Sequence, residues 1–297
     1  MDILYFQCLS GISGDMTVAA LLDLGVDQTQ FLEQLQKLNL SGYQIRIERK
    51  QKNGITGTKF TVLLDDEGHP DAHHQKHQHN HAHIHDQDDE HEHEDSHTHG
   101  HGHSHDHGDG HNHGHNHGTH IQRNLFDIEK LIDASDVTDR VKELSKTMFG
   151  YVAAAEAKVH DKPLSEVHFH EVGAVDSIVD IVGTAIAIDM LGSEEIYASP
   201  LHVGTGFVKC QHGRIPVPAP ATVEILKGVP IYSKGIQSEL VTPTGAAIIK
   251  TLAKDYIPLP EMVIEEVGYG LGTKELPVTN ALRVFKGKKK ALNPFSS

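Results

Sequence analysis

The segment 66–120 contains almost no side chains that could build a hydrophobic core. Residues 69–120 hold 21 of the 26 histidines of the chain. A packed domain needs apolar residues at regular spacing, so this segment cannot be part of one. We therefore predict a single α/β core domain built from residues 1–65 and 121–287, interrupted by a disordered metal-binding insertion at 66–120. The basic and polar residues 288–297 are predicted to form a disordered tail.

Within the insertion, histidine alternates with small or acidic residues over long runs. Neutral imidazole is a good ligand for nickel, copper, zinc and cobalt, and a flexible chain with a ligand at every second residue can hold several such ions loosely. The alternative is a spacer that happens to be rich in histidine. The pattern favours metal handling, although a segment without fixed geometry cannot be a catalytic site. The candidate ligands are His97, His99, His101, His103, His105, His107, His111, His113, His115 and His117.

The rest of the chain carries strand and helix patterns in mixed order. Alternating apolar residues predict strands at 43–50 and 55–64, and the residues between them are a hairpin turn signal. Apolar residues at helical spacing predict helices between 124 and 160, and the apolar run 175–191 predicts a buried helix. Because strands and helices do not alternate strictly, we predict an α/β fold with a mixed sheet and flanking helices.

Composition argues against several classes of protein. A formal net charge of −15 makes a nucleic-acid partner unfavourable. The most apolar long stretch, 175–191, is interrupted by three aspartates, which argues against a membrane span. The N-terminus has no signal-peptide pattern, so we expect a cytoplasmic protein. The two cysteines, Cys8 and Cys210, support neither a disulfide framework nor a zinc ribbon.

The segment 168–180 concentrates possible metal ligands, which are His168, His170, Glu171, Asp176 and Asp180. In an extended chain the two histidines share one face, and in a following helix the two aspartates lie one turn apart. Two imidazoles and three carboxylates at this spacing can ligate one or two divalent ions. The alternative is a helix start with a favourable aspartate and a partly buried histidine. Since carboxylates among apolar residues are costly unless paired, we favour the site.

Two further motifs resemble anion-binding turns. The first, SGISGDM, joins a predicted strand to a predicted helix, and the second, TPTGAA, opens another helix. Backbone amides and hydroxyls at such turns can hold a phosphate, and Asp15 can bind a metal or cap its helix. From spacing alone, a tight turn and a well-capped helix explain both motifs. The candidate residues are Ser10, Gly11, Ser13, Gly14, Thr242, Thr244 and Gly245.

Taken in order along the chain, several long motifs resemble the LarC family of nickel insertion proteins. They are SGISGDM, the histidine-rich insertion, VHFHEVGAVDSIVDIVG, HGRIPVPAPATVEILKG, ELVTPTGAA and GYGLGTKELPVTNALRVFKG. The resemblance runs from residue 3 to about residue 287. It implies a lyase-type nickel chelatase that inserts Ni²⁺ into pyridinium-3,5-bisthiocarboxylic acid mononucleotide for the nickel-pincer cofactor of lactate racemase-type enzymes. It also implies dependence on CTP with a divalent cation, Mn²⁺ or Mg²⁺.

The resemblance gives the motifs expected roles. Nickel would be gathered by the insertion and used at a site formed by Asp15, His168, His170, Glu171, Asp176 and Asp180, with the phosphate of the mononucleotide held by the two turn motifs. A carboxylate would act as the base for the ring proton that is lost when the carbon–nickel bond forms. We also expect a homo-oligomer.

The chain departs from the family pattern in two places. Gln7 stands where the family usually has an acidic residue, so a ligand is lost if that acid binds metal. Family members continue after LRVFKG into a C-terminal domain associated with nucleotide binding, which a frameshift product or a second chain would have to supply here. Two other classes stay open. One is a nickel storage or delivery protein without chemistry of its own, and the other is a metal-dependent phosphohydrolase using the same carboxylates.

Overall fold

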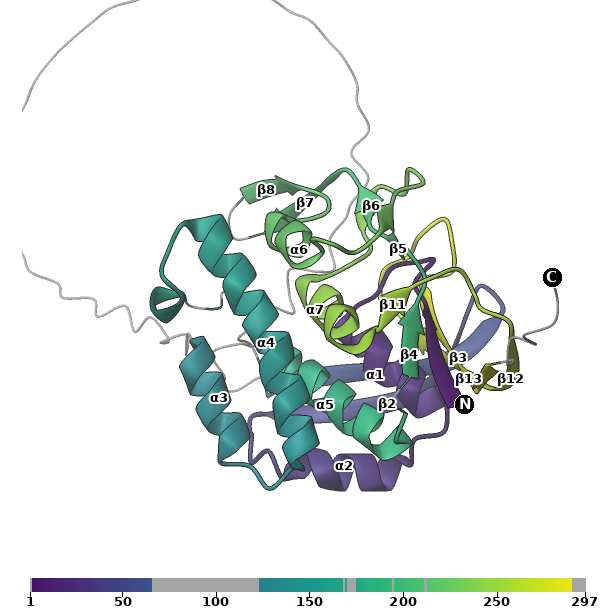
Figure 1. Cartoon of the computed structure of the whole chain (residues 1–297), viewed down its shortest axis with the longest axis horizontal. Helices are drawn as coiled ribbons and strands as arrows, with labels where there is room; N and C mark the ends of the chain where they lie inside the picture. The colour runs from purple at the N-terminus through teal and green to yellow at the C-terminus, as the bar shows by residue number, and fades with distance from the viewer. Residues whose placement is uncertain are drawn as a thin grey trace, which may run out of the picture.

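The fold is taken from a computed structural model that describes residues 2–65, 123–167, 169, 175–193, 195–210 and 213–289 (Figure 1). The predicted insertion at 66–120 lies outside the described residues. The same is true of His168, His170 and Glu171.

A seven-stranded mixed sheet forms the centre of the fold. In spatial order its strands are β11 (Asp255–Tyr256), β4 (Glu195–Ala198), β1 (Asp2–Gln7), β13 (Ala281–Lys289), β12 (Met262–Leu271), β3 (Ile55–Leu64) and β2 (Tyr43–Lys52). β4 is parallel to β1 and β11, and β12 is parallel to β3. β13 is antiparallel to β1 and β12, and β2 is antiparallel to β3. Strands from both sides of the insertion share this sheet, and the predicted mixed α/β architecture is confirmed.

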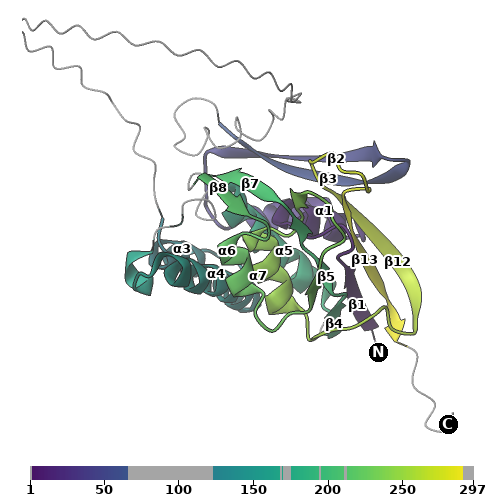
Figure 2. The same cartoon turned by 90° about the horizontal axis from the view of Figure 1, so that it is seen from above.

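Helices cover one side of the sheet, which curves around α1 (Figure 2). They are α1 (Gly14–Asp23), α2 (Gln28–Gln36), α3 (Leu125–Asp133), α4 (Asp139–His160), α5 (Val175–Leu191), α6 (Pro220–Ile225) and α7 (Pro243–Leu252), with a 3-10 turn, η2, at Leu164–Glu166. α1 packs against β12 and β3, α5 against α1, α4 against α5, and α3 against α4. Because α5 is enclosed by other helices, its sequence is apolar on nearly every side, as predicted.

Three short strand pairs connect α5 to α7. They are β5 (Leu201–His202) with β9 (Ile231–Tyr232), β6 (Gly204–Thr205) with β10 (Ser238–Glu239), and β7 (Phe207–Cys210) with β8 (Gly213–Pro216).

Local sequence signals explain where the elements begin and end. The Asp27 side chain accepts a hydrogen bond from the Gln30 amide at 2.8 Å and caps α2. Asn53 and Gly54 have φ values of 49° and 79°, the left-handed conformation that a tight hairpin needs between β2 and β3. The predicted hairpin is therefore confirmed.

The end of the core differs from the sequence expectation by two residues. β13 runs to Lys289, although a disordered tail was predicted from residue 288. Lys288 lies opposite both Asp2 and Val263, and its ammonium is 2.9 Å from the Glu265 carboxylate. Backbone pairing on both sides and this ion pair extend the strand into a sequence that is polar and basic.

The two faces of β1 point into different apolar clusters. Leu4 and Phe6 belong to the main core beneath the helices. Ile3 and Tyr5 lie on the opposite face, where the Tyr5 ring stacks with the Phe285 ring at a centroid distance of 6.3 Å. This alternation gives β1 an apolar cluster on each of its two faces.

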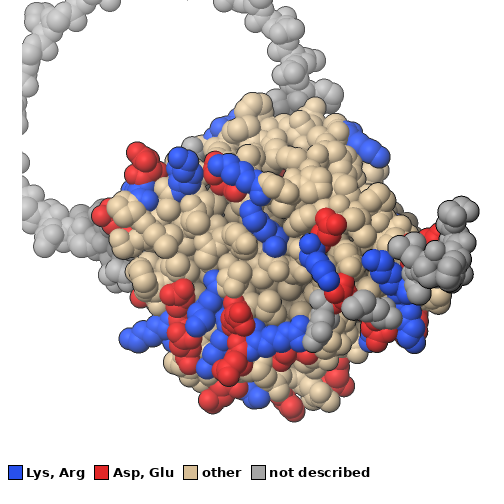
Figure 3. All heavy atoms as spheres, viewed as in Figure 1, with Lys and Arg blue, Asp and Glu red and all other residues tan. Residues whose placement is uncertain are grey.

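Two surface properties bear on the kind of protein. On the face seen in Figure 3, acidic and basic side chains of the described residues are interspersed and neither sign dominates. In the described part of the chain, no helix combines the length and the apolar character that crossing a membrane requires.

Candidate functional site

The two predicted turn motifs lie side by side at the end of β1. The loop that follows β1 pairs with the segment before α7 through Ile12 and Val241. The Ile12 amide donates to the Leu240 carbonyl at 2.9 Å, and the Thr242 amide donates to the Ile12 carbonyl at 3.2 Å. A Cβ on Gly245 would lie 2.2 Å from the Ile12 carbonyl oxygen, so this close approach requires glycine. SGISGDM and TPTGAA therefore form one structural unit.

Asp180 of α5 packs against the first turn of α1. A Cβ on Gly14 would lie 2.5 Å from Asp180 Oδ2, and the backbone amide of Asp15 donates a hydrogen bond to the Asp180 carboxylate. The Asp180 side chain thus satisfies an amide at the start of a neighbouring helix. This contact brings Asp15 and Asp180, two of the predicted site residues, together.

Lys59 of β3 completes this corner and was not singled out from the sequence. Its ammonium donates to Asp15 Oδ2 at 2.7 Å and to Thr273 Oγ1 at 2.7 Å. The Ser13 hydroxyl donates to the other oxygen of Asp15. One feature of the sequence could have indicated a role for Lys59, because it is the one charged residue in the strand Ile55–Leu64.

The ionisation of Asp180 is strongly perturbed. Its Oδ1 atom is buried and has no hydrogen-bond partner among the described residues. Burial raises the pKa of Asp180 well above its usual range, the negative charges of Asp15 and Asp176 raise this pKa further, and Lys59 opposes the shift. A carboxyl group in this setting takes up either a proton or a cation.

Replacing Asp180 by asparagine is expected to stabilise the metal-free protein near neutral pH. The pKa of Asp180 is higher in the folded protein than in the unfolded chain. The free energy of unfolding therefore falls as the pH rises from about 4, where a free aspartate ionises, up to the pKa of the folded state. Asp180→Asn should remove that pH-dependent loss and raise the free energy of unfolding by about 1 kcal/mol at neutral pH. Urea unfolding at several pH values, with chelator present, measures it. A variant that is less stable than wild type at every pH would contradict the expectation.

Several groups proposed for phosphate binding already have partners within the protein. The Gly11 amide donates to the Cys8 carbonyl at 3.2 Å, and the Ser10 hydroxyl donates to the Thr279 carbonyl at 2.9 Å. Thr242 accepts from the Gly245 amide at 3.1 Å and caps α7, whereas Thr244 lies buried in the first turn of that helix. The geometry thus shows a capped helix at α7, whereas Ser13 makes no side-chain cap to α1. An anion here would have to displace or share these bonds.

Asp176 lies in the first turn of α5, as the spacing predicted. Its Oδ1 accepts a hydrogen bond from the Ser177 amide at 2.8 Å. Between the two predicted histidines, Phe169 is buried against Phe149 with a ring distance of 6.3 Å, and its amide donates to the Arg123 carbonyl at 3.1 Å. Arg123, the first described residue after the insertion, therefore lies next to Phe169, which stands between the two predicted histidine ligands in the sequence.

The described residues alone do not form a metal centre. Among them, no three histidine, cysteine, aspartate or glutamate side chains are close enough together to hold an ion. His168, His170, Glu171 and the candidate histidines of the insertion lie outside the described residues, so the full predicted ligand set stays a prediction.

Two isolated soft ligands outside these motifs, His202 and Cys8, are buried in the fold. His202 is buried, its Nδ1 lies 2.9 Å from the Leu9 carbonyl oxygen, and its Nε2 accepts from the Lys234 amide at 3.0 Å. Both ring nitrogens are thereby engaged. Burial raises the pKa of the Cys8 thiol, which keeps it protonated.

Gln7 ends β1 and has an unusual environment. Its Oε1 is buried and has no hydrogen-bond partner among the described residues. The alternation of β1 places Gln7 on the face that carries Tyr5, opposite Phe6.

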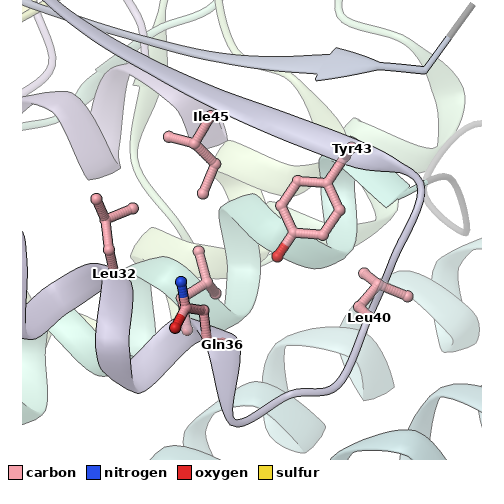
Figure 4. Close-up of a pocket in the computed structure, with 6 residues that line it drawn as sticks. Leu32, Gln36, Leu40, Tyr43 and Ile45 are labelled. Atoms are coloured by element: carbon pink, nitrogen blue, oxygen red, sulfur yellow. The ribbon is translucent and has the colours of Figure 1, made fainter.

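A separate cavity lies between α2 and β2 (Figure 4). It has a volume of about 320 Å³. It is lined by Leu32, Leu35, Gln36, Leu40, Tyr43 and Ile45. This lining contains none of the predicted site residues and offers no carboxylate or imidazole, so the cavity does not suit a divalent metal.

The family described as nickel insertion protein matches residues 4–294 of the chain. The chain belongs to this family. Curated relatives named pyridinium-3,5-bisthiocarboxylic acid mononucleotide nickel insertion protein occur in Acetivibrio thermocellus and Clostridium acetobutylicum. The first is 45% identical over 98% of this chain and 61% of its own length, and the second is 52% identical over 98% of this chain and 65% of its own length. The chain thus spans about three fifths of the length of such relatives. No solved structure matches it.

Proposed function

We propose that this chain is the metal-handling part of an enzyme that inserts nickel into pyridinium-3,5-bisthiocarboxylic acid mononucleotide. The product would carry a carbon–nickel bond flanked by two sulfur–nickel bonds. Family membership and the names of the two relatives support this substrate. The single structural observation that carries the proposal is the Asp180 carboxylate, buried against α1 with one oxygen unpartnered.

In this proposal the nickel ion is a substrate that the protein holds briefly. Asp176 and Asp180 on α5, with His168, His170 and Glu171 just upstream, supply oxygen and nitrogen ligands, and Asp15 stands beside them. Sulfur is the softer donor, so nickel passes from these ligands to the thiocarboxylate sulfurs of the substrate. The carbon–nickel bond replaces a ring C–H bond, and a carboxylate of the site accepts the released proton.

The anionic parts of the substrates need a different set of groups. We propose that the phosphate of the mononucleotide approaches the unit formed by residues 10–14 and the start of α7, where hydroxyl groups and helix N-termini meet. Reaction with CTP and Mg²⁺ or Mn²⁺ is part of the same proposal. The relatives contain a further part that this chain does not span, and in this proposal that part binds the nucleotide.

The insertion is proposed to deliver nickel. Its composition provides many imidazole ligands, and it is followed in the sequence by Arg123, whose carbonyl accepts a hydrogen bond from the Phe169 amide. Such tethering raises the effective concentration of bound nickel at the site.

A nickel store without chemistry is the second candidate, and the 21 histidines in residues 69–120 favour it. A store would gain nothing from an Asp180 carboxylate that packs against the first turn of α1 with one buried, unpartnered oxygen. The two functions therefore differ in whether Asp176 and Asp180 matter for anything beyond the amount of nickel bound.

Residues 1–297 tested alone are expected to show little CTP-dependent insertion. We expect activity when the remaining part of a longer relative is added, because this chain spans 61% to 65% of those proteins. The experiment incubates the chain, with and without that part, with nickel, CTP, Mg²⁺ and the thiolated precursor, and follows the metallated product by mass spectrometry. Full CTP-dependent insertion by the chain alone would place the nucleotide site within residues 1–297. No insertion in either mixture would favour the store.

A further inference from the structure

Lys59 is a cation inside an acidic corner of the molecule. Its side chain is 12% exposed, and its ammonium contacts one oxygen of Asp15 and the hydroxyl of Thr273. These two contacts link β3, the first turn of α1 and the loop that follows β12. A lysine held this way acts as a fixed positive charge.

That charge acts on the same carboxylates that the proposed metal would use. Lys59 favours ionisation of Asp180, whereas Asp15 and Asp176 oppose it, so each of these three charged groups lies within electrostatic range of Asp180. A divalent ion bound here would be repelled by the ammonium and would have to share Asp15 with it. In the structure Asp15 is turned toward Lys59 and Ser13, and the described carboxylates form no three-ligand cluster.

We propose that Lys59 is a positioning residue that competes with the incoming metal ion for the Asp15 carboxylate. Without metal, the Asp15 carboxylate is paired with the Lys59 ammonium. Metal entry breaks the Lys59–Asp15 ion pair, and the pair re-forms when the ion leaves on the substrate. Lys59 thereby keeps metal binding weak enough for release. This inference rests on the proposed function of the same site.

A purely structural role for Lys59 would be to anchor the loop after β12, and Lys52 provides a control for that role. Lys52 is on the same β2–β3 hairpin and is 11% exposed. Its ammonium donates to the carbonyls of Gly272, Thr273 and Lys274 at 3.1, 3.4 and 2.7 Å. Lys52→Met removes the same charge from the same hairpin and releases the same loop while leaving the Lys59–Asp15 ion pair in place.

The test measures Mn²⁺ binding to the full chain by electron paramagnetic resonance. Mn²⁺ prefers oxygen ligands and binds imidazole weakly, so it reports on the carboxylates more than on the histidines of the insertion. Lys59→Met is expected to lower the dissociation constant for Mn²⁺ about tenfold. A nearby unit charge shifts the pKa of a carboxyl group by about one unit or more, and we expect an effect of at least that size on metal binding. Lys59→Gln, which keeps a neutral donor, should give the same tightening. Lys52→Met should stay within about twofold of wild type, because the Lys52 ammonium pairs with the exposed Glu275 and contacts none of the proposed ligand carboxylates.

Two further results separate failure of this inference from failure of the proposed function. Asp180→Asn should abolish the site measured with Mn²⁺, and if it leaves binding unchanged, there is no metal site here and both ideas fall. If Asp180→Asn abolishes binding but neither Lys59 variant tightens it, only the role of Lys59 is wrong. Equal tightening by Lys52→Met would also overturn that role, since loop release would then explain the effect.

Discussion

Replacing Asp176 by alanine is expected to reduce nickel insertion by about 100-fold or more while most nickel stays bound to the protein. Mutating a residue that hydrogen-bonds to a metal ligand already lowers metal affinity or activity about 10- to 100-fold. Asp176 is proposed to be a ligand itself, so the loss should be at least as large. It stands in the first turn of α5, close enough to Asp180 to shift its ionisation. The histidines of the insertion would keep the total nickel content high. Product formation by mass and bound nickel by elemental analysis are measured on the same sample.

Asp189 on the same helix supplies the matched control. It lies near the other end of α5, where its carboxylate accepts from the Thr138 hydroxyl at 2.8 Å. Asp189→Ala removes an equal charge and a helix contact but none of the proposed ligands, so it should insert nickel at a rate close to wild type. Wild-type insertion by Asp176→Ala would remove α5 from the proposed site. An equal loss in both variants would indicate damage to the helix.

Removing the histidines of the insertion is expected to lower the number of nickel ions bound per chain severalfold. The segment 69–120 contains 21 of the 26 histidines, and their imidazole groups are good nickel ligands. Two variants are compared, a deletion of residues 66–120 and a full-length chain in which these histidines are asparagine. Equilibrium dialysis against nickel counts the bound ions, and thermal unfolding tests whether the core still folds.

The dependence on nickel concentration distinguishes delivery from catalysis. If the insertion gathers nickel, both variants should insert slowly at limiting nickel and recover when nickel is in excess. Unchanged nickel content after deletion would show that the insertion is a spacer. Insertion that stays low at saturating nickel would mean that the histidines take part in the reaction itself.

Many local features of the fold could be read from the sequence. Alternation in β2 and β3, the turn at Asn53–Gly54 and the cap at Asp27 all depend on residues within a few positions of one another. The apolar run between the three aspartates of α5 predicted a buried helix, and α1, α2, α4 and α7 pack around it. Such signals are strong because steric and hydrogen-bonding preferences of neighbouring residues act in every conformation of the chain.

The candidate site was predictable only in part. Asp176 and Asp180 were correctly placed one turn apart on a helix, since that depends on helical periodicity alone. The sequence did not predict that Asp180 packs against Gly14 or that Lys59 pairs with Asp15. These contacts join α5, α1 and β3, which come from distant parts of the chain.

The sequence by itself therefore determined the types of many elements and supplied the candidate metal ligands. Only the tertiary structure decided which of these residues meet and in which direction the pKa of Asp180 shifts. The order of strands in the mixed sheet puts Lys59 beside the first turn of α1 and sets the junction of residue 12 with residue 241. Contacts of this kind depend on the packing free energy of the whole core, and the ionisation of Asp180 depends on the burial that packing produces. Neither quantity is a property of a short stretch of chain.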